Sequence, residues 1–424
     1  MAGDSVHAVA SPGADAPRAE SSSAASGRIS QAGESRLAGL ESLRGMAAIG
    51  VIWTHAWVLS RDFVERTYTQ RLTDGTIYAI YLFFVMSGYL LFWPFAQAAW
   101  GNRKPVSVRK YAINRAWRVL PAYYVCLVVL MLVQPHEHAG RLWLAFTTFT
   151  QDFSIHTEGQ VDSPMWSLAT EMQFYIVLPL VAWGLARVSR GSIRNAAIAL
   201  GVLAGASFLA RELVQWGLLG LVSRATRAQM LWFNFTVLEL FCYFALGMGL
   251  ALWRVAIQRR RPKWLDGPLG HSNVWLAGAV ALWAIACYRD TWEILGALAS
   301  ALVVGALVLP LRHGHAIWPF RWRWMALLGV ISYSIYLWHV PVLVAISNRS
   351  LTTTHLVVGR GLTQLLGIGF PVSVAIGALS YWQIERRGLS RRRRWSGNTL
   401  ASASEPPAPG PEAATPPAPS LTHS

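Results

Sequence analysis

The sequence is poor in charged residues and in cysteine. Only 14% of its 424 residues are Asp, Glu, Lys or Arg, against roughly 25% in soluble domains. The three cysteines, Cys126, Cys242 and Cys287, all fall inside apolar runs, so they suit neither a disulfide framework nor a paired-cysteine zinc motif. These shortages argue against an ordinary soluble domain and against a small secreted domain held by disulfides.

Apolar residues, in contrast, make up 54% of the chain, with 21 tryptophans among them. Ten apolar runs are long enough, or nearly long enough, to cross a bilayer. They cover about residues 44–60, 76–96, 118–133, 166–188, 195–210, 232–255, 273–288, 294–309, 325–346 and 362–384. We therefore predict an all-α, polytopic membrane protein with about ten transmembrane helices.

The excess of basic residues supports this topology. The chain carries 37 Lys and Arg against 21 Asp and Glu. If the N-terminus is cytoplasmic and the runs alternate, 27 of the 37 basic residues fall on the cytoplasmic side. That asymmetry fits the positive-inside rule, and it argues against nucleic-acid binding because the basic residues lie between apolar segments. We predict a multi-pass protein of the plasma membrane with both termini in the cytoplasm.

The two ends of the chain differ in composition from its middle. Residues 1–35 are rich in Ala, Ser and Gly and lack the basic and apolar segments of a signal peptide. Residues 391–424 begin with a basic run and continue as a Pro/Ala-rich stretch. We predict disordered tails over both ranges, flanking one transmembrane domain at residues 36–390.

Ionisable residues inside the apolar runs are candidate functional residues, because each is costly to bury in a membrane. Arg44 and His55 are 11 residues apart, which places both on one face of a helix, roughly 16 Å apart along its axis. With the predicted topology, His55, Glu171 and His339 lie in the outer halves of three different helices, His55 and Glu171 at the same depth. We predict that the three form a buried polar site. The alternative for each histidine is an interhelical hydrogen bond without catalytic function.

Basic residues also enter one predicted helix. Arg115 and Arg118 are three residues apart and share a helical face. With Arg44, they are candidates for binding phosphate at the cytoplasmic mouth of the helices. The alternative is ordinary positive-inside charge. Ser87, which precedes Gly88, is interpreted as a small packing residue because no GxSxG nucleophile motif surrounds it.

Five sequence blocks together resemble a known family. They are LESLRGMAA at 40–48 followed by His55, FFVMSGY at 83–89, NRAWRVLP at 114–121, WSLATEMQFY at 166–175 and ISYSIYLWH at 331–339. In these blocks and their order the chain resembles the membrane-bound acyltransferase family 3, whose members O-acylate cell-surface glycans and some antibiotics. The resemblance spans about residues 37–388. One departure from the family pattern is the single acid in Thr170-Glu171-Met172.

The resemblance implies transfer of an acyl group, commonly acetyl, from acyl-CoA to a hydroxyl. The CoA phosphates are then expected on Arg44, Arg115 and Arg118, with the thioester beside His55. On this hypothesis His55 is the general base, which removes the proton from the acceptor hydroxyl.

The remaining roles follow from the same hypothesis. Glu171 is expected to orient or charge-balance His55, as the third group of a triad does. His339 or Tyr336 is expected to stabilise the oxyanion. Trp166, Ser167, Tyr175 and Tyr336 are the expected substrate-binding residues. No metal is expected, because no spacing in the sequence suits a set of metal ligands.

The predicted acceptor is a hydroxyl of a cell-envelope glycan or glycolipid. Two alternatives remain open: acylation of a macrolide-type small molecule, and a transporter of a lipid-linked glycan, which would also use many helices and intramembrane charge. A transporter favours inverted internal repeats, and the sequence shows none.

Overall fold

A computed structural model describes residues 18–60, 68–134, 137–154, 156–216, 235–288, 293–350 and 360–388. The predicted tail at 391–424 and the first 17 residues lie outside these ranges. Helix α1 begins at Arg18, so it includes part of the range that the sequence assigns to an N-terminal tail. The predicted domain boundaries therefore stay predictions.

All regular elements of the described residues are helical, apart from one isolated bridge between His271 and Arg312. The helices are α1 (Arg18–Leu59), α2 (Tyr68–Asp74), α3 (Ala79–Trp100), α4 (Val108–Val133), α5 (Ala139–Thr147), α6 (Met165–Ser189), α7 (Ile193–Trp216), α9 (Val237–Arg259), α10 (Ser272–Tyr288), α11 (Glu293–Val308), α12 (Arg323–Ser350), α13 (Arg360–Gln364) and α14 (Phe370–Ser380). Short 3₁₀ turns include η1 (Gly75–Tyr78) and η6 (His315–Arg321). The all-helical prediction is confirmed for this part of the chain.

Seven helical segments of the described chain are long and apolar enough to cross a membrane. They are Arg71–Trp100, Val108–Val133, Met165–Ser189, Ile193–Leu213, Val237–Arg259, Arg323–Ser347 and Gly361–Gly388. The runs predicted at 273–288 and 294–309 form α10 and α11, which are apolar but have only 17 and 16 residues. The predicted count of about ten spans and the predicted cytoplasmic termini stay predictions.

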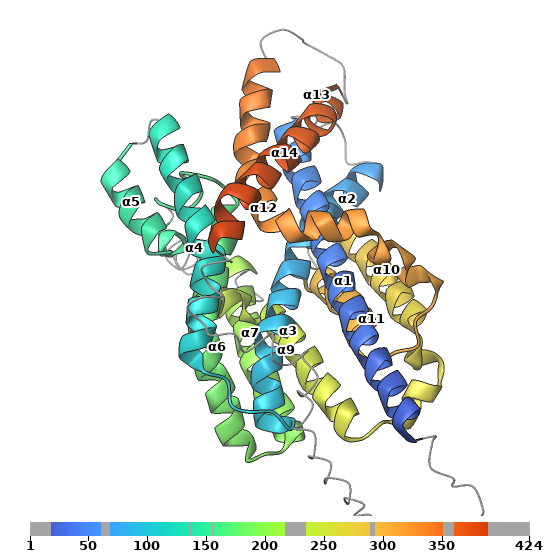
Figure 1. The fold of residues 1–424 in the computed structure, drawn as a ribbon. Helices are drawn as coiled ribbons and strands as arrows, with labels where there is room; N and C mark the ends of the chain where they lie inside the picture. Colours follow the sequence, from blue (N-terminus) through green and yellow to red (C-terminus); the bar gives the residue numbers. More distant parts are fainter. Residues whose placement is uncertain are drawn as a thin grey trace, which may run out of the picture.

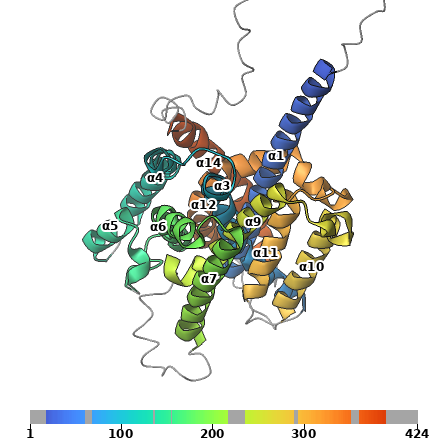
Figure 2. The same ribbon diagram turned by 90° about the horizontal axis from the view of Figure 1, so that it is seen from below.

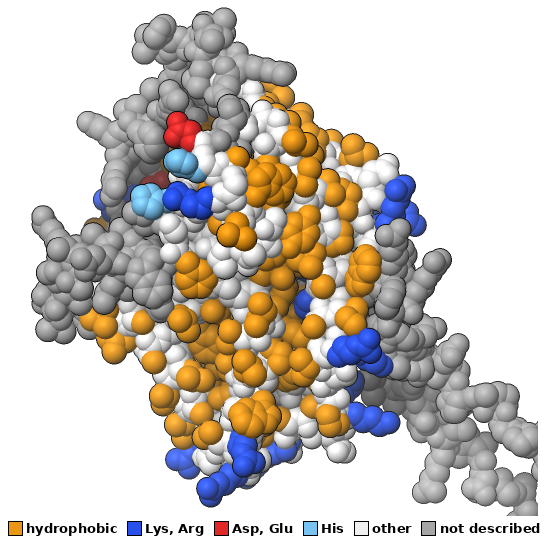
Figure 3. All heavy atoms as spheres, turned by 90° about the vertical axis from the view of Figure 1, so that its left-hand side faces the viewer, with side chains coloured by type: hydrophobic (Ala, Val, Ile, Leu, Met, Phe, Trp, Pro, Cys, Tyr) orange, Lys and Arg blue, Asp and Glu red, His pale blue; other side chains and the backbone are white. Residues whose placement is uncertain are grey.

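The long helices run roughly side by side (Figure 1). Seen from below, α3 lies near the middle, with α1, α4, α6 and α9 around it (Figure 2). The flank shown in Figure 3 carries many apolar side chains, and Lys and Arg lie mainly at its lower end and along its right-hand edge. An apolar flank suits a surface that faces lipid, because lipid cannot hydrate polar side chains.

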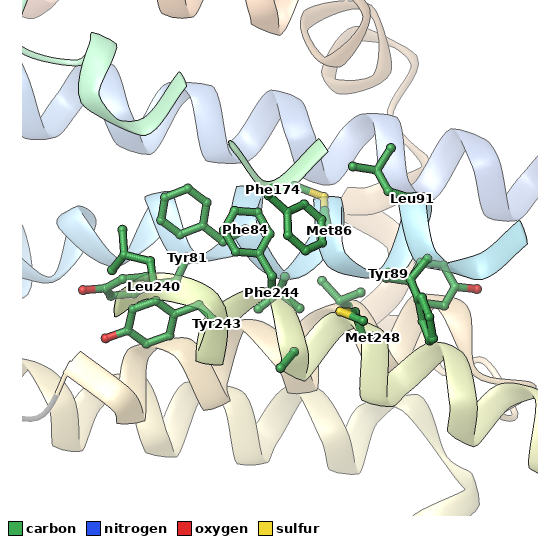
Figure 4. Close-up of a cluster of buried hydrophobic side chains, with 14 of the residues drawn as sticks. Tyr81, Phe84, Met86, Tyr89, Leu91, Phe174, Leu240, Tyr243, Phe244 and Met248 are labelled. Carbon is green, nitrogen blue, oxygen red and sulfur yellow. The ribbon is translucent and has the colours of Figure 1, made fainter. Parts of the chain in front are cut away.

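The closest packing around α3 is its contact with α9. Tyr81, Phe84 and Tyr89 of α3 interleave with Tyr243 and Phe244 of α9 (Figure 4). Two glycines let the backbones approach: a Cβ on Gly88 would lie 2.0 Å from the Phe244 carbonyl oxygen, and one on Gly247 would lie 1.9 Å from that of Val85. Small residues at helix contacts are the usual means of tight packing in membranes.

Gly247→Leu is therefore expected to destabilise the bundle, because its side chain would collide with backbone that cannot move aside. Overpacking of this kind costs about 1–3 kcal/mol or more. The measurement is the apparent melting temperature of the detergent-solubilised protein. Gly249→Leu on the same helix is the control, since a Cβ there meets open space. Equal melting temperatures for the two variants would contradict the packing argument.

Candidate active site

The site is built where α1 packs against α12. Two glycines bring the backbones together: a Cβ on Gly329 would lie 1.7 Å from the Glu41 carbonyl oxygen, and one on Gly45 would lie 2.3 Å from that of Met325. Because α1 and α12 approach this closely, side chains farther along the two helices also meet. His55 of α1 and His339 of α12 are such a pair, with ring centroids 4.8 Å apart.

The two histidines form a hydrogen-bonded dyad. His339 Nε2 lies 3.1 Å from His55 Nδ1. His339 Nδ1 lies 2.7 Å from the Tyr336 carbonyl oxygen, and His55 Nδ1 lies 2.9 Å from that of Val51. A carbonyl oxygen only accepts, so both Nδ1 atoms carry the proton when the rings are neutral. His339 Nε2 then accepts from His55 Nδ1–H, and the unprotonated nitrogen of His55 is Nε2.

This tautomer pattern gives the two histidines different chemistry. His55 Nε2 has a free lone pair, and no described residue forms a hydrogen bond with it, so it can take a proton. In neutral His339 the single N–H is used by the Tyr336 carbonyl, and Nε2 is an acceptor. His339 therefore has no spare donor for an oxyanion, and its geometry suits orienting His55 instead.

A narrow cavity, with about 70 Å³ open to the centre of a water molecule, lies between α1, α3, α4, α6 and α12. Arg44, Arg115 and Arg118 all line it, together with Glu171 and Tyr175. The structure thus brings the three predicted arginines to one cavity. Arg44 is not at the end of its helix, however, because α1 begins 26 residues earlier, at Arg18. Its guanidinium faces an internal cavity.

Glu171 belongs to this arginine cavity and not to the histidine dyad. Ser87 Oγ donates to Glu171 Oε1 at 2.6 Å, and the Tyr175 hydroxyl also forms a hydrogen bond with Glu171. Arg44 interacts with Glu171 electrostatically. The predicted pairing of Glu171 with His55 is therefore wrong in this structure. His55 bonds instead to Val51 and His339.

Glu171 does not reach His55 because of the level at which α6 packs against α12. The first turn of α6 holds Ser167, whose Oγ lies 2.5 Å from the Tyr336 hydroxyl. Glu171 follows four residues later, roughly 6 Å farther along the helix and away from His339. Equal distance from a predicted helix end does not mean equal depth, because the helices tilt and begin at different levels.

The expected substrate-binding residues fall into two groups. Ser167, Tyr175 and Tyr336 line the cavity, and the Tyr336 hydroxyl donates to the Pro164 carbonyl at 3.1 Å. Trp166 is not among the lining residues. Its ring packs 4.5 Å from that of Phe235 and 6.0 Å from that of Phe84, measured between centroids.

Ser87 is the residue that the sequence interpretation undervalued. It lines the cavity and is the hydrogen-bond donor to Glu171, so it is more than a small packing residue. Its neighbour Gly88 does serve the packing role, against Phe244. The signal available in the sequence was a polar side chain in the middle of the otherwise apolar FFVMSGY block.

Two buried carboxyl groups lie between α5 and α6, outside the membrane-spanning segments. Asp152 is 1% exposed and Asp162 is 5% exposed. Neither oxygen of Asp152, nor Oδ2 of Asp162, has a hydrogen-bond partner among the described residues. Burial raises the pKa of Asp152 to about 9 and the pKa of Asp162 to about 8, so both are protonated in the folded protein at neutral pH.

Stability is accordingly expected to fall as the pH rises. Unfolded Asp162 ionises near 3.8 and the folded group near 8. Between these values the folded state holds the extra proton, so the free energy of unfolding decreases by up to about 1.4 kcal/mol per pH unit. Asp162→Asn should therefore gain melting temperature over the wild type as pH increases from 5 to 8. Asp266→Asn, at an exposed aspartate paired with Arg261, is the control. If the difference in melting temperature between Asp162→Asn and the wild type did not change with pH, the raised pKa of Asp162 would be contradicted.

Comparison with known proteins agrees with the blocks in the sequence. The profile of the family described as "Acyltransferase domain" matches residues 37–382. The chain is 26% identical over 385 residues to YrhL of Bacillus subtilis (strain 168), a candidate peptidoglycan O-acetyltransferase, covering 84% of this chain and 56% of that protein. It is 22% identical over 353 residues to the peptidoglycan O-acetyltransferase OatA of Listeria monocytogenes, covering 76% and 52%.

A third relative is BcsY of Komagataeibacter xylinus, a candidate membrane-bound transacylase, at 24% identity over 381 residues, 84% of this chain and 83% of that protein. The chain thus spans only about half the length of the two relatives named for peptidoglycan. No solved structure matches. Because the family profile covers most of the sequence, including all five blocks, the chain belongs to the membrane-bound acyltransferase family 3.

Proposed function

We propose that this protein is a membrane O-acyltransferase that moves an acyl group, commonly acetyl, from acyl-CoA to a hydroxyl of a cell-envelope glycan or glycolipid. The observation that carries the proposal is the pair of features on α1. Arg44 lines a cavity with two further arginines, and His55, 11 residues away, presents an unprotonated nitrogen. The two lie roughly 16 Å apart along the helix, a separation that suits an extended pantetheine arm.

The donor end of the proposed site is the arginine cavity. Three guanidinium groups line the cavity with one carboxylate, that of Glu171, and the buried Glu385 interacts electrostatically with Arg44 and Arg118. Three positive charges are therefore opposed by at most two negative ones, which leaves positive charge for an anion. Arg115 Nε is buried without a hydrogen-bond partner among the described residues, and an incoming phosphate oxygen would supply one. Arginine forks suit phosphate because they donate two parallel hydrogen bonds. The cavity is narrow, so it would take the phosphate and arm of the donor and not a bulky glycan.

The acceptor end is the histidine dyad. His55 Nε2 would accept the proton of the acceptor hydroxyl as its oxygen attacks the thioester carbonyl. The thiolate of CoA leaves, and the proton held by His55 neutralises it. As His55 becomes positively charged, its Nδ1–H donates more strongly to His339 Nε2. His339 thus stabilises the charged base without a second ionised group.

Substitution of His339 separates this orienting role from simple packing. Glutamine keeps an acceptor oxygen for His55 Nδ1–H, whereas alanine does not. We expect kcat to fall about tenfold to a hundredfold in His339→Ala, as for other residues that orient a functional ligand, and to fall less in His339→Gln. KM for the donor should stay constant in both. The measurement is steady-state kinetics across pH. If kcat fell equally in His339→Ala and His339→Gln, with an unchanged pH profile, His339 would not have the orienting role.

The activity itself is tested with radiolabelled acetyl-CoA. Purified protein in liposomes is incubated with labelled donor and an extract of envelope glycans and glycolipids, and both released CoA and labelled product are measured. Label transferred to a hydroxyl supports the proposal. Release of no CoA with any acceptor fraction, together with movement of unmodified glycan across the bilayer, would favour the transporter alternative.

A further inference from the structure

A second and larger cavity lies on the other side of α1 from the arginines. About 500 Å³ of it is open to the centre of a water molecule, between α1, η1, α3, α10, α11 and η6. No charged residue is among its described lining residues. Figure 1 shows α1, α10 and α11 running alongside one another in this part of the molecule. The described residues leave this volume as an open groove between the helices.

The walls of this groove are regular helix faces. Leu276, Ala279, Val280 and Trp283 of α10 line it, and their spacing of i, i+3, i+4 and i+7 defines one stripe of a helix. Ala299 lies on the facing side of α11. Val280 is 65% exposed, so the groove opens sideways. In a bundle that crosses a membrane, such an opening faces acyl chains.

One end of the groove is closed and the other is basic. At the closed end, the Trp283 indole donates to the Gly75 carbonyl at 3.0 Å. At the other end, Phe320 of η6 lines the groove. The exposed Arg321 is the next residue, and the exposed Arg323 follows two positions later. Trp324 beside them is 67% exposed. Exposed tryptophan next to arginine is typical of the membrane–water interface, where headgroups lie.

We propose that this groove is a binding site for one anionic phospholipid. An acyl chain occupies the apolar channel between α10, α11 and α1, and the phosphate lies against Arg321 at the η6 end. Basic residues that border a groove at the interface are the usual means of holding anionic headgroups. A protein partner fits less well, because the groove opens sideways at Val280, where a membrane-spanning bundle meets acyl chains.

The site adjoins the proposed active centre without sharing its residues. Met46 and Gly50 of α1 and Leu82 of α3 line the lipid groove, whereas Arg44 of α1 and Ser87 of α3 line the arginine cavity. The lipid therefore packs against the backs of two helices that carry the proposed donor site. A bound lipid could therefore hold α1 and α3 in place relative to each other.

Native mass spectrometry of the full chain tests the proposal, with dioleoyl phosphatidylglycerol and dioleoyl phosphatidylcholine titrated in parallel. The wild type should retain one phosphatidylglycerol at concentrations where phosphatidylcholine does not bind. Val280→Trp, which fills the open side of the groove, should weaken this binding at least tenfold. Ile285→Trp is the control, since Ile285 is an exposed residue of the same helix outside the groove, and it should change binding less than twofold.

Arg321→Glu tests the headgroup separately and leaves the apolar channel intact. It should abolish the preference for phosphatidylglycerol over phosphatidylcholine. A second readout is the rise in melting temperature on adding phosphatidylglycerol, which should be lost in Val280→Trp and kept in Ile285→Trp. Wild-type affinity in Val280→Trp, or an unchanged lipid preference in Arg321→Glu, would overturn the proposal. Neither variant alters a proposed catalytic or donor-binding residue, so these outcomes do not depend on the proposed function.

Discussion

His55→Ala is expected to abolish acyl transfer while the protein still inserts and folds. The variant removes the one nitrogen in the dyad that has a free lone pair, and loss of a general base typically costs about 10²–10⁴-fold in rate. The loss should appear in kcat, because the imidazole meets the acceptor hydroxyl and not the donor phosphates. The measurement is transfer of labelled acetyl groups by the reconstituted protein.

The variant also leaves His339 Nε2 without its partner, so folding must be checked alongside activity. A melting curve and the affinity for unreactive donor analogue serve that purpose, since both should stay close to wild type. His55→Gln is the matched control for packing, because it keeps a polar side chain of similar length but supplies no base. Substantial transfer by either variant would show that His55 is not the base.

Arg118→Ala is expected to raise KM for acyl-CoA with little change in kcat. Arg118 enters the cavity from α4 beside Arg44 and Arg115, and a hydrogen bond to a charged group contributes about 1.5–3 kcal/mol. Since about 1.4 kcal/mol corresponds to a factor of ten, KM should rise roughly tenfold to a hundredfold. Arg44→Ala should behave in the same way.

Arg109→Ala is the control for the arginine series. Arg109 is exposed in the first turn of α4 and lies outside the cavity, so its removal changes the net charge equally without touching the proposed donor site. Raising the ionic strength should weaken the non-specific electrostatic attraction between the protein and the anionic donor equally in all variants. If KM for the donor is the same in Arg118→Ala, Arg44→Ala and Arg109→Ala, the cavity does not bind the phosphates of CoA.

The separation of the arginine cavity from the dyad changes the expected mechanism. A pair of His55 and Glu171 would have joined donor binding and proton transfer at one level. In the structure Glu171 instead receives hydrogen bonds from Ser87 and Tyr175, among the arginines. It is therefore suited to holding the guanidinium groups in position, and in the proposed mechanism His339, which lies 3.1 Å from His55 Nδ1, orients His55.

The sequence by itself determined the helical class, the positions of the apolar runs and the grouping of residues that share one helix. Arg44 with His55, and Arg115 with Arg118, lie on common faces because the helical repeat is a local property of the backbone. The membrane setting follows equally from composition, since long apolar runs cannot be buried within one soluble domain of this size.

Only the tertiary structure decided which helices meet and at what level. His55 pairs with His339 because the glycine contacts Gly45 and Gly329 bring α1 onto α12. Glu171 lies with the arginines because α6 enters the bundle at the level of Tyr336. Tilt, helix length and backbone approach depend on packing between segments far apart in the chain, and no periodicity within a single run encodes them.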